Sequence, residues 1–96
     1  MYTADGKTNG PAFSWPDGKR IAVMVTFDYD AEFLRMSRAK SKGTSIGFTD
    51  FSRGQYGPHE GLARCLDMLD TMNIKSTFFV PGAVIETYRD TVEEIH

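Results

Sequence analysis

The chain has 96 residues, of which 41% are hydrophobic and 25% charged, and its formal net charge is −2. These proportions are typical of a globular domain or part of one, and they exclude fibrous and intrinsically disordered classes. The basic residues are scattered except for Arg35, Arg38, Lys40 and Lys42. We interpret that stretch as a solvated loop and expect no nucleic-acid partner.

Membrane and secretion signals are absent from the sequence pattern. The longest apolar run is far shorter than the roughly 18 to 20 residues of a membrane span, and polar Thr3, Asp5 and Lys7 stand where a signal peptide needs a hydrophobic core. Cys65 is the only cysteine, which excludes an internal disulfide and suits a reducing compartment. We therefore expect a cytoplasmic protein with no membrane partner, and we interpret Cys65 as a core residue.

The first regular element predicted is a β-strand. Residues 1–19 are punctuated by Pro and Gly, which predicts an extended lead in which Phe13 and Trp15 cover the base of the core. Residues 20–28 are apolar on both faces of an extended chain. That pattern favours a buried, central strand of a parallel sheet.

An acidic cluster of Asp28, Asp30 and Glu32 follows this strand directly. In a regular strand Asp28 and Asp30 point to one face while Tyr29 points away. Because α/β proteins bind ligands beyond the carboxyl ends of their strands, the cluster predicts a metal or catalytic site. Solvated carboxylates in a turn are the alternative. Three carboxylates alone would favour Mg²⁺ or Ca²⁺ over zinc.

Residues 31–57 contain four glycines and many Ser and Thr, which predicts a long loop over the site with a short helix near residues 33–38. A loop of that length in a compact domain is usually functional. Arg53 and Tyr56 are therefore candidates for substrate contact, and the alternative is that they order the loop.

A helix is predicted from Pro58 to about Asn73, because Pro is favoured at a first helical position and Asn at a helix end. Its apolar residues recur every three or four positions: Leu62, Cys65, Leu66, Leu69 and Met72. His59 lies at the start of this helix. We interpret it as a surface or capping residue, with metal ligation as the alternative.

A second strand and helix complete the pattern. Residues 75–80 are β-prone, with Phe78 and Phe79 as strand-interior core, and Pro81-Gly82 closes the strand before a second helical periodicity. Strand, helix, strand, helix is an α/β arrangement with a parallel sheet. Two strands alone leave apolar surface exposed, so we expect that the natural chain continues past His96 or that copies associate as a homo-oligomer.

Three motifs together carry a family resemblance. They are Thr-Phe-Asp-Tyr-Asp at residues 26–30, Tyr56-Gly57, and Thr-Phe-Phe-Val-Pro-Gly at residues 77–82. From about Trp15 onward the chain resembles the opening of polysaccharide deacetylases of the NodB-homology type. The Asp-x-Asp-Ala-Glu form is similar to the branch that includes peptidoglycan-deacetylase-like and allantoinase-like proteins.

The resemblance implies the N-terminal βαβα part of a distorted (β/α)7 barrel. It also implies a divalent metal, usually zinc, that is held by one aspartate and a His-x-x-x-His pair and activates water to hydrolyse a carbon–nitrogen bond. The substrate would be an N-acetylated sugar or a small cyclic amide or ureide. Asp30 matches the metal-binding aspartate and Asp28 the general base, although Tyr29 separates aspartates that are adjacent in the larger branch, so the two roles could be exchanged.

The histidine pair of that family has no counterpart in these 96 residues, where His59 and His96 are the only histidines. We therefore expect the chain alone to bind zinc poorly and to have no hydrolase activity, unless one of these histidines substitutes.

Two other classes stay open. In a haloacid-dehalogenase-type phosphatase, Asp28 would be the nucleophile and Asp30 the general acid, with Mg²⁺; Glu32 does not fit the usual pattern of that family. The remaining class is a non-catalytic interaction module.

Overall fold

The computed structural model describes residues 13–96. Within them the elements follow in the order η1 (Pro16–Gly18), β1 (Thr26–Asp28), α1 (Phe33–Ser41), α2 (Phe48–Gly54), η2 (Gly57–Gly61), α3 (Leu62–Thr71), β2 (Thr77–Phe79), α4 (Gly82–Thr87) and α5 (Arg89–Glu93). The two strands pair in parallel, with Phe27 opposite Phe78 and Asp28 opposite Phe79. The predicted mixture of helices with a parallel sheet is confirmed, and the seven-stranded barrel stays a prediction.

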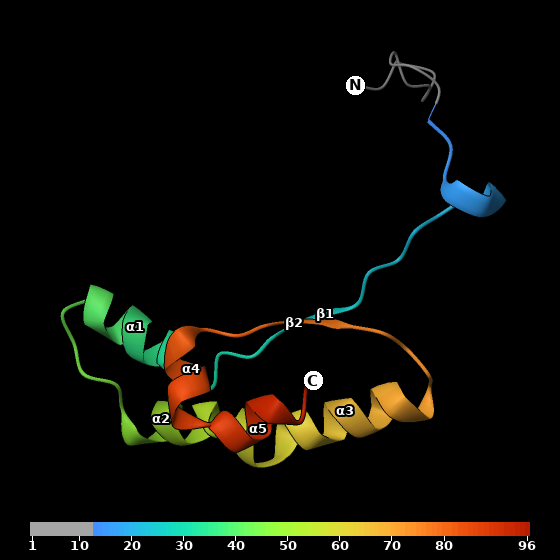
Figure 1. The fold of residues 1–96 in the computed structure, drawn as a ribbon. Coiled ribbons are helices and arrows are strands. Elements are labelled where there is room, and N and C mark those ends of the chain that lie inside the picture. The colour runs from blue at the N-terminus through green and yellow to red at the C-terminus, as the bar shows by residue number, and fades with distance from the viewer. Residues whose placement is uncertain (1–12) are drawn as a thin grey trace.

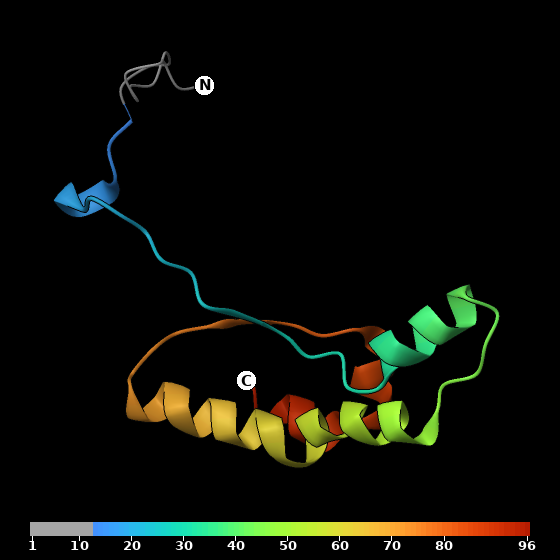
Figure 2. The ribbon, with the colours of Figure 1, turned by 180° about the vertical axis from the view of Figure 1, so that it is seen from behind.

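In Figures 1 and 2, α3 and α5 lie beneath the strand pair, whereas α1, α2 and α4 lie toward the carboxyl ends of the strands. The core therefore forms between the sheet and the helices. Its buried centre consists of Tyr29, Leu62 and Val84. Partly buried side chains pack around that centre: Ala31, Phe33, Leu66, Phe78, Val80, Tyr88, Val92 and Ile95. Cys65 is partly buried on α3.

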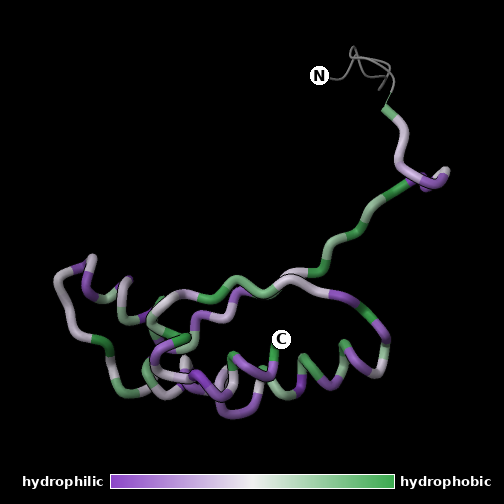
Figure 3. The backbone as a smooth tube through the Cα atoms, viewed as in Figure 1, coloured by the Kyte–Doolittle hydropathy of each residue, from purple (hydrophilic) through white to green (hydrophobic). Residues whose placement is uncertain are grey.

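The first strand is shorter than predicted. Only Thr26–Asp28 is paired, and immediately before it the Val25 carbonyl accepts hydrogen bonds from the Thr77 N–H at 3.1 Å and the Ser76 hydroxyl at 2.9 Å. Upstream, Val23 and Met24 are 77% and 86% exposed, and Figure 3 shows this extended hydrophobic segment leading into the sheet. The prediction of a buried, central strand over residues 20–28 is therefore wrong. Within residues 13–96, β1 has one neighbouring strand and so lies at an edge of the sheet.

The N-terminal lead does not cover the core. Phe13 and Trp15 are exposed and pack edge-to-face on each other, with ring centroids 5.0 Å apart. Figure 1 shows this segment extending away from the helices. The prediction that these two rings cover the base of the core is therefore wrong, and residues 1–12 of the predicted lead lie outside the described residues.

Residues 31–57 contain two helices, so the prediction of a long irregular loop is corrected. The expected short helix near residues 33–38 is present as α1 and extends to Ser41. Good helix formers such as Leu34, Arg35 and Met36 support α1 although it buries no residue fully. Arg35 pairs with Asp50 of α2 at 3.2 Å on the exposed surface.

The helix predicted from Pro58 is confirmed. Pro58 is buried in η2, a single wide turn in which the Leu62 N–H bonds the Gly57 carbonyl, and α3 continues from it. The helix stops at Asn73, whose φ of 52° is left-handed, and the Ile74 N–H closes the end on the Leu69 carbonyl at 2.9 Å.

The last predicted helix is divided in two. Tyr88 lies between α4 and α5 with φ −121° and ψ 43°, which interrupts the helical backbone there. Among residues 13–96, no helix combines the length and apolar character required to span a bilayer.

Candidate functional site

The two candidate aspartates lie where β1 ends. Asp28 is the last residue of the strand and is exposed, whereas Asp30 is partly buried. Tyr29 between them is buried in the core, and its N–H donates to the Phe79 carbonyl at 2.9 Å. This alternation agrees with the prediction that Tyr29 points away from the carboxylate of Asp28.

The two faces of the sheet differ in their surroundings. Phe27 stacks on Phe78 with a centroid distance of 5.1 Å and an interplanar angle of 18°, and both rings are partly buried. Phe79, opposite Asp28, is 57% exposed. The interpretation of Phe79 as core is therefore wrong, because the structure places the helices on the other face of this sheet. Asp28 thus lies beside an exposed aromatic ring.

The chain turns sharply directly after Asp30. Ala31 adopts a left-handed conformation with φ 49°, and the Phe33 N–H bonds the Asp30 carbonyl at 3.1 Å at the start of α1. A left-handed backbone costs a non-glycine residue about 1 to 2 kcal/mol. The surrounding contacts must therefore hold this turn in place.

Glu32 is buried, unlike its acidic neighbours. It is 4% exposed, and the Tyr88 phenol donates to its two carboxylate oxygens at 2.8 and 2.9 Å. Burial, and then this hydrogen bond, raises the pKa of Tyr88 above its usual value of 10.0. The prediction of a cluster of three available carboxylates is therefore wrong, because the carboxylate of Glu32 is buried and hydrogen-bonded to Tyr88.

The buried Tyr29 is hydrogen-bonded to the same stretch of the chain, at the start of α5. The Tyr29 hydroxyl lies 2.7 Å from the Thr91 hydroxyl, and Thr91 donates its proton to the Tyr88 carbonyl at 2.8 Å. Since Thr91 has one hydroxyl proton, Tyr29 is the donor in the first bond. Burial raises the pKa of Tyr29 above its usual value. The sequence pattern predicted no hydrogen-bonding role for Tyr29 or Tyr88.

The other candidate residues lie on neighbouring elements. Arg53 is exposed on the last turn of α2, and Tyr56, just after it, is 54% exposed. His59 is exposed in η2, with its ring 6.3 Å from that of Tyr88 and nearly perpendicular to it. Residues 13–96 contain no group of three or more His, Cys, Asp or Glu side chains that could hold a metal. Substrate contact by Arg53 and Tyr56 stays a prediction.

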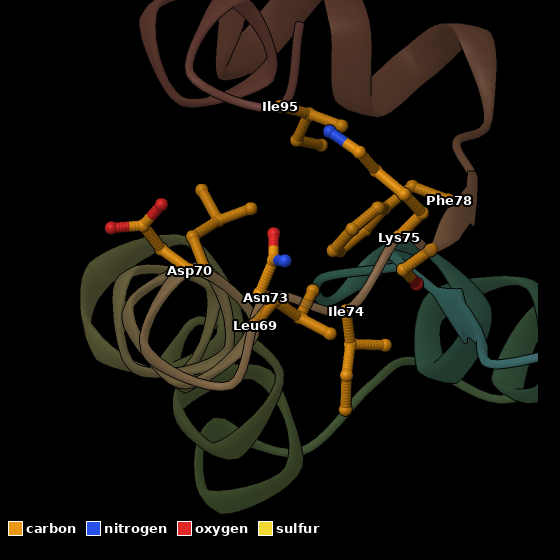
Figure 4. Close-up of a pocket in the computed structure, with 9 residues that line it drawn as sticks. Leu69, Asp70, Asn73, Ile74, Lys75, Phe78 and Ile95 are labelled. Atoms are coloured by element: carbon orange, nitrogen blue, oxygen red, sulfur yellow. The ribbon is translucent and has the colours of Figure 1, made fainter.

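Two cavities differ in their relation to the aspartates. An apolar cavity of about 190 Å³ lies between the sheet and the helices, where Asp28, Phe27 and Leu62 help to line it. A second cavity, of about 230 Å³, lies where α3 ends and β2 begins, with Asp70 and Lys75 among its lining residues (Figure 4). Because that position is the amino end of β2, the second cavity lies at the opposite end of the sheet from Asp28 and is not part of this site.

Comparison with known proteins yields one informative match. No protein-family profile matches the chain, and no curated protein matches it. The chain is similar to the crystal structure of a candidate polysaccharide deacetylase from Mycobacterium smegmatis, with 37% sequence identity and a TM-score of 0.71. The similarity covers 92% of this chain and 30% of that protein. It supports the predicted deacetylase family, while the predicted branch stays a prediction.

Proposed function

We propose that this chain supplies part of the catalytic domain of a hydrolase that cleaves carbon–nitrogen bonds other than peptide bonds. The observation that supports it is the similarity to the Mycobacterium smegmatis protein across 92% of the chain. The substrate class is an N-acetylated sugar or a small cyclic amide or ureide. Both present an amide carbonyl that water can attack.

Asp28 is proposed as the general base. A general base must reach the proton of the attacking water, and Asp28 is exposed at the carboxyl end of the parallel strands, where α/β proteins bind ligands. It would take that proton as the oxygen attacks the carbonyl. Arg53 and Tyr56 are proposed to contact the substrate, since both side chains are exposed after the turn that carries Asp30.

Asp30 is proposed as one ligand of a divalent metal, zinc by family resemblance. Zinc takes about four donors, chiefly nitrogen and sulfur. Asp28 and Asp30 do not make up such a set, and residues 13–96 hold no larger group that could. The described residues therefore do not fit a zinc site by themselves, and the remaining ligands would come from outside them.

A zinc titration of the chain tests the role of Asp30. We expect weak binding in the unaltered chain that is lost in Asp30→Asn. Asp67→Asn is the matched control, because it removes the same charge from an exposed position on α3. Equal, measurable affinity in the unaltered chain and Asp30→Asn would contradict a metal-binding role for Asp30. If neither binds zinc, the same pair is titrated in the hybrid described next, and equal affinity there would contradict the role.

Hydrolysis is best tested in a hybrid in which this chain replaces the matched segment of the Mycobacterium smegmatis protein. Release of acetate from an N-acetylated sugar oligomer, or opening of a cyclic ureide, should disappear in Asp28→Asn and persist in Asp67→Asn. Phosphate release with Mg²⁺ and no amide hydrolysis would instead support a phosphatase. A folded hybrid without turnover, beside an active parent protein, would support a non-catalytic module.

A further inference from the structure

Asp30 lies between two side chains that are anchored to the same short stretch of the chain. Tyr29 precedes it and bonds Thr91, while Ala31 and then Glu32 follow it, and Glu32 bonds Tyr88. We propose that Tyr88 and Thr91 are positioning residues that fix the carboxylate of Asp30. This role rests on the proposed function, in which Asp30 is a functional carboxylate.

Hydrogen bonds join Tyr29, Thr91, Tyr88 and Glu32 into one network on both sides of Asp30, which we call the bracket. On one side Tyr29 donates to Thr91 at 2.7 Å, and on the other Tyr88 donates to both oxygens of Glu32 at 2.8 and 2.9 Å. Thr91 then donates to the Tyr88 carbonyl at 2.8 Å, which joins the two anchors. Asp30 and Ala31 are thus the only residues of the turn between the two anchored side chains.

Burial makes the bracket stiff. Tyr29 and Glu32 are 5% and 4% exposed, and no buried side-chain nitrogen or oxygen of residues 13–96 lacks a hydrogen-bond partner. Removing one partner from such a network leaves a desolvated polar group unpaired, which is costly. Breaking the Tyr29–Thr91 or the Tyr88–Glu32 hydrogen bond is therefore costly in free energy.

Backbone packing restrains the same turn independently. Gly54 of α2 lies so close to Glu32 that a Cβ at position 54 would fall 2.8 Å from the Glu32 Cβ. Ala31 also keeps a left-handed φ of 49°, which an L-residue rarely adopts without support. The bracket supplies that support from α5 and from the break before it, which lie 56 to 62 positions away in the sequence.

The test is amide hydrogen exchange and the carboxyl carbon-13 shift of Asp30, measured by NMR on the isotopically labelled chain. Tyr88→Phe and Thr91→Val each remove one hydroxyl from the bracket. Thr91→Ser is the conservative variant that keeps the hydroxyl. Ser76→Ala is the matched control, since it removes one hydrogen bond to the Val25 carbonyl at the other end of β1.

We expect the Tyr29 and Phe33 amides, which bond the Phe79 and Asp30 carbonyls on either side of the turn, to exchange about fivefold faster in Tyr88→Phe and in Thr91→Val. That factor corresponds to the net free energy of one hydrogen bond, about 1 kcal/mol. The carboxyl shift of Asp30 should move in the same variants. Thr91→Ser should restore both readouts, and Ser76→Ala should leave both unchanged. The Leu66 amide on α3 reports global unfolding and separates a local effect from a general loss of stability.

Unchanged exchange and an unchanged Asp30 shift in both hydroxyl deletions would overturn the proposal, as would equal changes in Ser76→Ala. If Tyr88→Phe fails to fold, the pair Thr91→Val and Thr91→Ser decides the matter alone. Failure of the proposed function would appear separately, as a zinc titration that Asp30→Asn does not alter, because the NMR readouts require neither metal nor turnover.

Discussion

Gly54 lies against the backbone of Glu32 with no room for a side chain between them. A Cβ built on Gly54 would stand 2.4 Å from the Glu32 Cα and 2.9 Å from its backbone nitrogen. Real Cβ atoms essentially never approach backbone atoms so closely. The last turn of α2 is therefore packed directly on the turn that carries the candidate aspartate Asp30.

Gly54→Ala should destabilise the chain by about 1 to 3 kcal/mol, the usual cost of forcing extra atoms into a packed contact. The helix preference of Ala over Gly opposes this loss by roughly 0.5 to 1 kcal/mol. Gly82→Ala is the matched control, because Gly82 is also helical and a Cβ there meets nothing within 4 Å. Urea unfolding of both variants checks the difference, and a Gly54→Ala chain as stable as Gly82→Ala would contradict the close contact.

The left-handed turn at Ala31 predicts that glycine is tolerated at this position and that a β-branched residue is not. Ala31→Gly removes the steric cost of φ 49° and adds conformational freedom to the unfolded chain, so we expect a net change in stability within about 1 kcal/mol. Ala31→Val should destabilise by more than that, because a β-branched residue at positive φ is a genuine outlier. The free energy of unfolding of the two variants is the measurement. Equal stability of both would show that Ala31 is not held left-handed in solution.

The order of the elements follows from local patterns in the sequence. Pro58 and the apolar spacing that begins at Leu62 predict the long helix, and Asn73 predicts its end, because a helix stripe and a left-handed stop are properties of neighbouring residues. The parallel pairing of two strands separated by helices follows in the same way. These features needed no knowledge of distant contacts.

The length of the strands and the bracket around Asp30 depend on contacts between distant residues. Residues 20–24 have strand composition, yet they lie outside the stretch that pairs with β2, since a strand extends only as far as its partner. Glu32 looked like one more carboxylate of an acidic cluster, and its burial depends on Tyr88, 56 positions away. Local propensity and periodicity do not predict that pairing. A tyrosine in an apolar helical pattern gives the same pattern whether or not its hydroxyl bonds a carboxylate.

The core centre is small, which makes one side chain unusually informative. Val84 on α4 is fully buried, in contact with the cluster that contains Tyr29 and Leu62. Val84→Ala should destabilise by about 1.5 to 3 kcal/mol through lost burial and the cavity left behind. Val23→Ala makes the same chemical change at a residue that is 77% exposed and should cost less than about 0.5 kcal/mol. Thermal or urea unfolding checks the pair, and similar losses in both would contradict the burial of Val84 in the core centre.

Alkaline pH should weaken the fold through Tyr88. Burial and the hydrogen bond to Glu32 raise its pKa in the folded chain above 10.0, so the unfolded chain loses this proton first as the pH rises. Above about pH 10 the unfolded state binds fewer protons than the folded state, and stability must then fall with increasing pH, whereas below that range the contribution of Tyr88 is complete.

Urea midpoints measured from about pH 8 to 11 should therefore decline, and the decline should be shallower in Tyr88→Phe. Tyr56→Phe, which removes a phenol that is 54% exposed, is the matched control. If the urea midpoint falls equally steeply with pH in Tyr88→Phe and in the unaltered chain, then the pKa of Tyr88 is not raised in the folded chain, and the prediction is wrong.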